Sequence, residues 1–162
     1  FPQPGYHVLA NDPSSPISWK ALVDSEGGVG QNYQPMIVVA AIIKKGRLVL
    51  LAERVGETPA SGWEFPGGKV EKGETPERAL AREIQEELKV KIKVGRLLDT
   101  VNLPGQPETK LMAFEAELLS DTISLTSHRG YAWARPEELL QFQLLPADRE
   151  LVERLQARNY FG

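Results

Sequence analysis

Apolar positions along the chain are grouped into short strand-like runs. A continuous apolar run rich in β-branched residues extends over residues 37–43 and predicts a buried strand. Lys44-Lys45-Gly46 is typical of a turn, and residues 47–54 predict a second strand that returns beside the first. Further strands are expected at 92–101, 110–118 and 131–134.

A helical period follows the second strand. Leu80, Ile84 and Leu88 recur at four-residue steps and form an apolar stripe suited to burial. Thr75-Pro76 is a helix start, because a hydroxyl can cap the first turn and proline lacks only an N–H that would be unpaired there. We therefore predict a helix from this point to about Leu88.

The C-terminal part predicts a helical turn at 135–140 and an amphipathic helix from Ala147 to about Arg158. Leu151, Val152 and Leu155 are expected to face inward from that helix. Strands that flank one helix and precede another indicate an α/β sandwich.

Residues 1–35 differ in composition from the rest of the chain. They hold five prolines and the Gly27-Gly28-Val29-Gly30 cluster, which interrupt regular structure. We expect an N-terminal extension here, either an extended arm packed on the domain or a short strand at 17–23 that forms an extra sheet edge or a homodimer contact. The domain proper is expected over 36–162.

Composition limits the function classes. The 162 residues suffice for one domain with a core, and the absence of cysteine excludes disulfides, thiolate metal sites and cysteine nucleophiles. A net charge of −3 gives no basic footprint for duplex nucleic acid. No apolar run approaches the roughly 20 residues of a membrane span, and no signal peptide is visible at the start. We expect a cytoplasmic protein.

Three carboxylates are brought together on the predicted helix. Residues three and four apart are neighbours on a helix, so Glu83, Glu86 and Glu87 project from one side. Such a group is a solvated face in most helices. Carboxylates this close nevertheless repel one another unless a cation lies between them, and Mg2+ takes carboxylate and phosphate oxygens. The alternative to a solvated face is therefore a helix that holds Mg2+ against a phosphate chain.

The spacing of these residues resembles the Nudix box. The matching positions are Gly68, Glu74, Arg82, Glu83, Ile84, Glu86, Glu87 and Val90. Lys89 stands where the family usually has a glycine that ends the helix in a left-handed conformation, so the lysine costs about 1 kcal/mol or ends the helix differently. The resemblance covers roughly residues 36–158 and implies the α/β class with the Nudix α/β/α sandwich, in which a mixed β-sheet lies between helices.

The resemblance also implies roles for the box residues. Glu83 and Glu87 would bind Mg2+ or Mn2+, with Glu86 as a further ligand or a group behind the ligands. The carbonyl of Gly67 would complete the metal shell, and Gly68 would lie against the substrate. Arg82 would pair with Glu74 and hold the helix on its loop.

Outside the box the chain is similar to the MutT-like branch, at residues 51–54, 63–71 and 145–148. That branch places a phosphate-contacting arginine where Arg54 stands, although a surface salt bridge is an equal alternative. It also carries an Asn or Asp that reads the base edge at the position of Asp148. A helix cap or a first-turn acid is the alternative there.

The loop before the late tryptophan-containing strand departs from the branch, which often has a glutamate there. Residues 125–133 contain no carboxylate, and Ser127, His128 or Arg129 takes the place. His128 could accept a proton near neutral pH, although a lone loop histidine is usually solvated. Glu86 is the alternative base.

The resemblance implies a Mg-dependent pyrophosphohydrolase that converts the triphosphate of a damaged or minor nucleoside to a monophosphate and pyrophosphate. Hydrolysis of ADP-ribose, a nucleotide sugar or a dinucleoside polyphosphate is the alternative within the enzyme class. A catalytically weak nucleotide-binding or regulatory protein is the alternative outside it, left open by the missing loop carboxylate.

Overall fold

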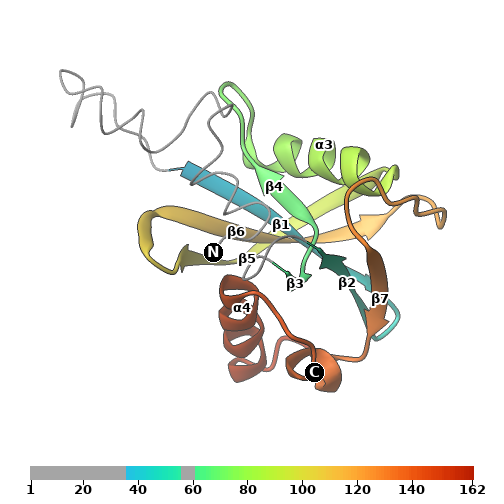
Figure 1. Cartoon of the computed structure of the whole chain (residues 1–162), viewed down its shortest axis with the longest axis vertical. Helices are drawn as coiled ribbons and strands as arrows, with labels where there is room; N and C mark the ends of the chain where they lie inside the picture. Colours follow the sequence, from blue (N-terminus) through green and yellow to red (C-terminus); the bar gives the residue numbers. More distant parts are fainter. Residues whose placement is uncertain (1–35, 56–60) are drawn as a thin grey trace.

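The computed structural model describes residues 36–55 and 61–162 (Figure 1). The predictions for residues 1–35, an extended arm or a strand at a sheet edge or a homodimer contact, lie outside the described residues. Within the described ranges no helix is long and apolar enough to cross a membrane.

The described residues form a seven-stranded sheet, and it is mixed, as the resemblance implies. Its path runs β3-β2-β1-β6-β5, with β4 paired to β1 and β7 paired to β2. The β1–β6 pair is parallel and the other pairs are antiparallel. The strands are β1 (Met36–Lys45), β2 (Leu48–Arg54), β3 (Gly62–Glu64), β4 (Gly67–Lys69), β5 (Ile92–Leu103), β6 (Gln106–Leu118) and β7 (Gly130–Ala134).

On the side of β1 that faces away from β6, two strands pair with it one after the other, and this divides the sheet. β4 pairs with β1 at residues 38–40, whereas β2 pairs with it at residues 44–45. Between them, the backbone nitrogen of Ala41 donates to the carbonyl of Pro66 at 2.9 Å. The glycine-rich segment therefore begins where the two halves of the sheet separate.

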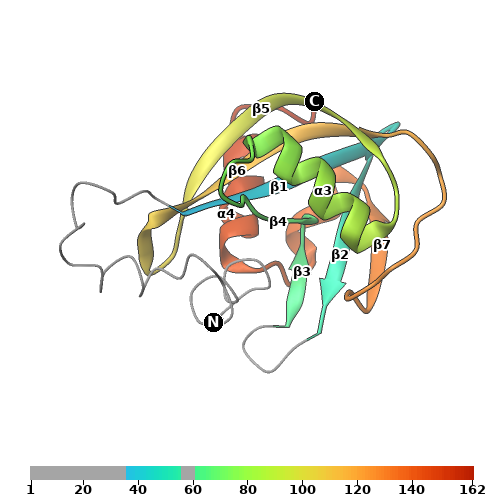
Figure 2. The ribbon, with the colours of Figure 1, turned by 90° about the horizontal axis from the view of Figure 1, so that it is seen from above.

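Two α-helices cover opposite faces of the sheet (Figures 1 and 2). Helix α3 (Pro76–Leu88) lies on one face and α4 (Pro146–Ala157) on the other, preceded by the 3-10 helix η2 (Pro136–Gln141). The predicted inward residues Leu151, Val152 and Leu155 of α4 are fully buried. The α/β/α sandwich predicted from the sequence is thus confirmed.

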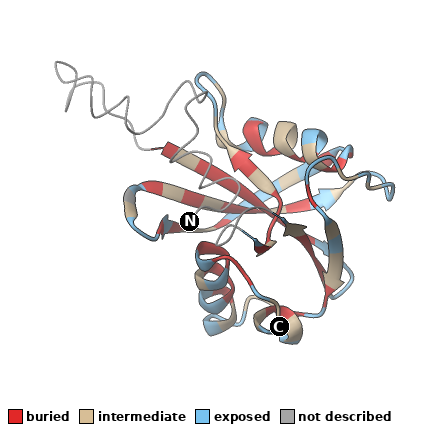
Figure 3. Ribbon diagram, in the orientation of Figure 1, coloured by how far each residue is buried: buried red, intermediate tan, exposed pale blue. Residues whose placement is uncertain are grey.

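The apolar run of β1 is continuous because the strand is covered on both faces (Figure 3). Val38, Ala40 and Ile42 belong to the core beneath α4. Val39 and Ala41 belong to the core beneath α3. Since successive side chains of a strand point to opposite faces, each face needs its own apolar set.

Two features of the sheet differ from prediction. The short strands β3 and β4 were not expected from the sequence, and β5 and β6 extend beyond the predicted 92–101 and 110–118. β5 and β6 continue up to a tight turn at Pro104-Gly105, where Gly105 has a positive φ of 75°. Their additional residues include polar ones, because this part of the hairpin has an exposed face.

Helix α3 begins as predicted and ends in a strained way. Thr75 caps its start, and the Thr75 Oγ1 accepts a hydrogen bond from the backbone nitrogen of Arg78 at 3.1 Å. Lys89 ends it with φ 57° and ψ 37°, and its backbone nitrogen donates to the carbonyl of Gln85. The lysine therefore adopts the left-handed conformation of the family's glycine and bears its conformational cost.

Candidate active site

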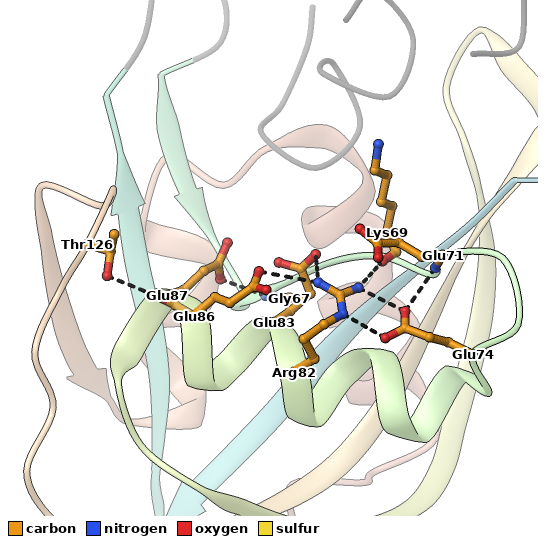
Figure 4. Close-up of polar contacts among 9 residues, drawn as sticks. All are labelled: Gly67, Lys69, Glu71, Glu74, Arg82, Glu83, Glu86, Glu87 and Thr126. Carbon is orange, nitrogen blue, oxygen red and sulfur yellow. Dashed lines mark hydrogen bonds and ion pairs between the residues drawn. The ribbon is translucent and has the colours of Figure 1, made fainter. Parts of the chain in front are cut away.

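A forked contact between Arg82 and Glu74 joins α3 to the loop before it (Figure 4). Arg82 Nε donates to Glu74 Oε2 at 2.6 Å, and Arg82 Nη2 donates to Glu74 Oε1 at 2.9 Å. Nη2 also donates to the carbonyl of Lys69 at 3.0 Å, while Glu74 Oε1 accepts from the backbone nitrogen of Glu71. The predicted pairing of Arg82 with Glu74 is confirmed.

The same guanidinium neutralises part of the acidic edge of α3, the side of the helix that carries Glu83, Glu86 and Glu87. Arg82 Nη1 lies 3.2 Å from Glu83 Oε2 and 3.2 Å from Glu86 Oε1. The hydrogen bond from Arg82 lowers the pKa of Glu74, and the hydrogen bond to Glu74 raises the pKa of Arg82. Arg82 is thus a permanent cation between the loop and the acidic residues.

Glu83 packs against the glycine-rich loop. A Cβ atom at Gly68 would lie 2.3 Å from Glu83 Cδ, so any residue other than glycine would displace this carboxylate. The Glu83 side chain is 14% exposed. Burial raises its pKa to about 7, with the nearby Arg82 opposing the shift and Glu86 adding to it.

Glu87 is held by the neighbouring glycine. Its Oε1 accepts a hydrogen bond from the backbone nitrogen of Gly67 at 3.2 Å. A Cβ atom at Gly67 would lie 1.9 Å from the carbonyl oxygen of Val39, so glycine is required for β4 to approach β1. Burial raises the pKa of Glu87 to about 8, and the charges of Glu64 and Glu83 add to the shift.

A buried carboxylate that sequence reasoning did not assign lies beside this edge. Glu64 on β3 contacts His128, with 2.8 Å between Glu64 Oε2 and His128 Nε2. The two side chains are 7% and 0% exposed, so the expectation of a solvated His128 is wrong. A usable signal was the position of Glu64 between the aromatic residues Trp63 and Phe65, immediately before the glycine-rich loop.

Strand pairing brings Arg54 to the same place. Glu64 lies opposite Ala52 of β2, and residues opposite each other share a face of the sheet. Arg54, two residues further along β2, shares that face and is half-buried. Burial lowers the pKa of Arg54, whereas the charges of Glu64 and Glu87 raise it. Its Nε is buried without a hydrogen-bond partner among the described residues, which disfavours the surface salt bridge.

Asp148 lies in the first turn of α4 and is fully buried. Its Oδ1 accepts a hydrogen bond from the backbone nitrogen of Phe65 at 3.0 Å. The cap residue of α4 is Leu145, so the helix-cap interpretation is wrong and the first-turn position is confirmed. Asp148 therefore fixes α4 to the segment that leads into the glycine-rich loop.

The acidic edge suits a divalent cation that is held partly by substrate. Among the described residues no three carboxylate or imidazole groups converge closely enough to enclose an ion alone. Glu83 and Glu87, however, lie one helical turn apart, and burial raises the pKa of each. A cation would stabilise both as carboxylates, and Mg2+ commonly binds one or two carboxylates together with waters and phosphate oxygens.

The sheet lies between helices, and the glycine-rich loop packs on the carboxylates of α3, as the resemblance to the Nudix box implies. The chain belongs to the Nudix family: the NUDIX domain matches residues 33–155. Nudix hydrolases generally use a divalent metal, and the chain is a pyrophosphohydrolase of the MutT-like branch.

Relatives from several organisms support this placement. The CTP pyrophosphohydrolase of Escherichia coli (strain K12) is 38% identical over 126 residues, which are 74% of this chain and 90% of that one. The 8-oxo-dGTP diphosphatase of Haemophilus influenzae is 34% identical over 124 residues, 73% and 89% of the two chains. The crystal structure of the MutT protein from Methanosarcina mazei Go1 gives a TM-score of 0.64 at 30% identity, covering 80% of this chain and 99% of that one.

Proposed function

We propose that the chain hydrolyses a nucleoside triphosphate to the monophosphate and pyrophosphate, with Mg2+ or Mn2+ as the metal. The observation that carries the proposal is the burial of Glu83 and Glu87 against Gly67 and Gly68, with Arg54 in electrostatic reach of Glu87. The names of the relatives, a CTP pyrophosphohydrolase and an 8-oxo-dGTP diphosphatase, support a triphosphate of the nucleotide pool.

Glu83 and Glu87 are the proposed metal ligands, with Glu86 and the carbonyl of Gly67 as further candidates. The metal would neutralise phosphate charge and lower the pKa of a bound water. Arg54 would bind phosphate oxygens, since a guanidinium forms paired hydrogen bonds with them. Its buried Nε, unpaired among the described residues, is a donor that such a ligand could satisfy.

Hydrolysis requires a group that accepts the proton of the attacking water. Glu86 is the candidate on the acidic edge that solvent reaches, because 58% of its side chain is exposed. As water adds to phosphorus, the bond to the bridging oxygen breaks and that oxygen leaves with pyrophosphate or with the nucleoside monophosphate. Arg82 stays paired with Glu74 and keeps Glu83 and Glu86 in position.

A substrate panel tests the proposal directly. Purified protein would be incubated with CTP, dCTP, dGTP, 8-oxo-dGTP, ADP-ribose, a UDP-sugar and a dinucleoside tetraphosphate. Each would be measured with Mg2+, with Mn2+ and with a chelator. We expect a monophosphate and intact pyrophosphate from at least one triphosphate, and no product in chelator.

The other outcomes of the panel separate the alternatives. Faster turnover of ADP-ribose, the UDP-sugar or the tetraphosphate would replace the triphosphate assignment. Tight nucleotide binding without any turnover would identify a binding or regulatory protein. Full turnover in chelator would refute the metal assignment.

A further inference from the structure

The connection between β6 and β7 contacts the last turn of α3. The backbone nitrogen of Ser124 donates to the carbonyl of Leu88 at 2.9 Å, and that of Thr126 donates to the carbonyl of Glu87 at 3.1 Å. Thr126 Oγ1 donates to the carbonyl of Glu86 at 2.8 Å (Figure 4). These carbonyls belong to the end of the helix, where intrahelical partners are lacking.

The same connection carries His128 to the buried Glu64. One proton between His128 Nε2 and Glu64 Oε2 links the two side chains, whichever atom carries it. The following residue, Arg129, donates from its backbone nitrogen to the carbonyl of Glu53 at 2.8 Å. The loop is therefore attached to α3, to β3 and to β2 within a few residues.

The attached groups all belong to the proposed hydrolase site. The final turn of α3 carries Glu86 and Glu87, and Glu64 lies within electrostatic reach of both Glu87 and Arg54. That turn ends at Lys89 in a left-handed conformation that a lysine adopts at a cost. Hydrogen bonds from outside the helix are the means of holding such an end in place.

We propose that Thr126 and His128 are positioning residues of this site, through which one loop holds both the end of α3 and the Glu64 carboxylate. The proposal rests on the proposed function, which assigns Glu86 and Glu87 to metal binding and Arg54, beside Glu64, to phosphate binding. Residues 125–133 lack a carboxylate of their own, and in this proposal they contribute by holding other residues of the site in position. Neither Thr126 nor His128 needs to touch the substrate.

Paired substitutions test the two contacts. Thr126→Val removes the hydroxyl at nearly constant shape, whereas Thr126→Ser keeps it. His128→Phe removes the ring nitrogens, whereas His128→Gln keeps a side-chain N–H. The matched control is Thr122→Val, at an exposed threonine of the same loop.

Two measurements would be made on each variant of the full chain. The first is kcat and KM for the best nucleotide, together with the Mg2+ concentration that gives half-maximal rate. The second is the affinity for Mn2+ by calorimetry without nucleotide, which needs no turnover. Thermal melts would show that each variant is folded.

We expect His128→Phe to lower kcat or metal affinity by about 10- to 100-fold, with a smaller change in KM. Thr126→Val, which loses one hydrogen bond, should lower the same quantities by roughly 2- to 10-fold. Thr126→Ser and His128→Gln should recover most of the loss, and Thr122→Val should match wild type. In a Glu64→Gln background, His128→Phe should have a markedly smaller additional effect.

Folded Thr126→Val and His128→Phe proteins with wild-type Mn2+ affinity and wild-type kcat would overturn the proposal. So would fully additive effects of Glu64→Gln and His128→Phe. If His128→Phe does not fold, the comparison of Thr126→Val with Thr126→Ser decides whether the loop positions the site, because Thr126 is exposed. If wild type hydrolyses no nucleotide, the proposed function fails, and Mn2+ affinity alone decides whether the loop positions the metal-binding residues.

Discussion

Asp148 Oδ1 and the backbone nitrogen of Phe65 form a buried hydrogen bond of 3.0 Å across 83 positions of sequence. Asp148→Ala would leave that N–H buried without this acceptor, so the free energy of unfolding should fall by about 1–3 kcal/mol. Asp148→Asn keeps a carbonyl oxygen and should lose less. Chemical denaturation of the three proteins measures the difference.

The same variants test the base-reading role. If Asp148 contacts a base edge, Asp148→Ala should raise KM for the preferred nucleotide roughly ten- to a hundred-fold more than for a poor one. If the two nucleotides keep the same ratio of KM values in Asp148→Ala, Asp148 does not belong to the substrate site. Its role is then only the structural hydrogen bond to Phe65.

Arg82→Ala should damage stability and turnover together. It leaves Glu74 and Glu83 without their shared cation, and we expect a loss of about 1–3 kcal/mol in unfolding free energy. The rate should fall by roughly 10- to 100-fold. Arg82→Lys should restore little, because an ammonium cannot form the two parallel bonds to Glu74. Arg78→Ala, an exposed arginine of the same helix, is the control; wild-type values for Arg82→Ala would refute the role.

Glu87→Gln should remain folded and lose most of its activity, by roughly 100-fold or more. Glutamine keeps an oxygen that can accept from Gly67, but it removes the negative charge that a cation needs. Steady-state rates with a thermal melt measure both effects. Glu77→Gln, at an exposed position of the same helix, should behave as wild type, and an equally active Glu87→Gln protein would make the acidic edge structural.

The metal-free protein should lose stability as the pH rises from about 5 to 8. Burial raises the pKa of Glu64, and it raises the pKa values of Glu83 and Glu87 to about 7 and about 8, above the ordinary value of 4.5. In that interval the folded state binds more protons than the unfolded state, so the free energy of unfolding falls with pH. His128, whose pKa burial lowers, opposes this only below its ordinary value of 6.5.

Melting temperatures between pH 5 and 8.5, in chelator and in Mg2+, test this behaviour. In chelator we expect the melting temperature to fall with rising pH by an amount equivalent to a few kcal/mol of unfolding free energy. This fall should be smaller in Mg2+, which stabilises the carboxylates, and smaller in Glu87→Gln. A metal-free melting temperature that rises between pH 6.5 and 8 would contradict the prediction.

Lys89→Gly should stabilise the protein by about 0.5–1 kcal/mol. Glycine adopts the observed φ of 57° without the contact between Cβ and the carbonyl that lysine makes. Lys89→Ala is the matched comparison, because alanine removes the long side chain yet keeps Cβ, and it should give no such gain. Equal stability of the two variants would show that the conformation is not the cause.

Local signals in the sequence were sufficient for much of this structure. The strand β1 followed from an uninterrupted apolar run, and α3 followed from Thr75, Pro76 and the stripe that includes Leu80 and Ile84. The pairing of Arg82 with Glu74 followed from the family pattern. Each of these features depends on residues that lie close together in the chain.

The remaining features depend on distant partners. β3 and β4 are three residues long, and they are strands because β2 and β1 lie beside them. Glu64 and His128 are 64 positions apart, and nothing near either residue indicates that they meet. The position of Asp148 in its helix could be read locally, but its hydrogen bond to Phe65 could not.

The parallel pairing of β1 with β6 has a consequence for how the chain reaches this state. The pairs run from Met36–Thr109 to Ile43–Ala116, so the central strand β1 cannot complete its pairing until β6, much later in the chain, is present. Contacts of such sequence separation slow folding, because loop closure must precede them. During synthesis the Nudix box emerges before β6 and α4. A nascent chain can thus carry every glutamate of the box while the sheet beneath them is still incomplete, and hydrolytic competence should arise only after β6 and α4 have been synthesised.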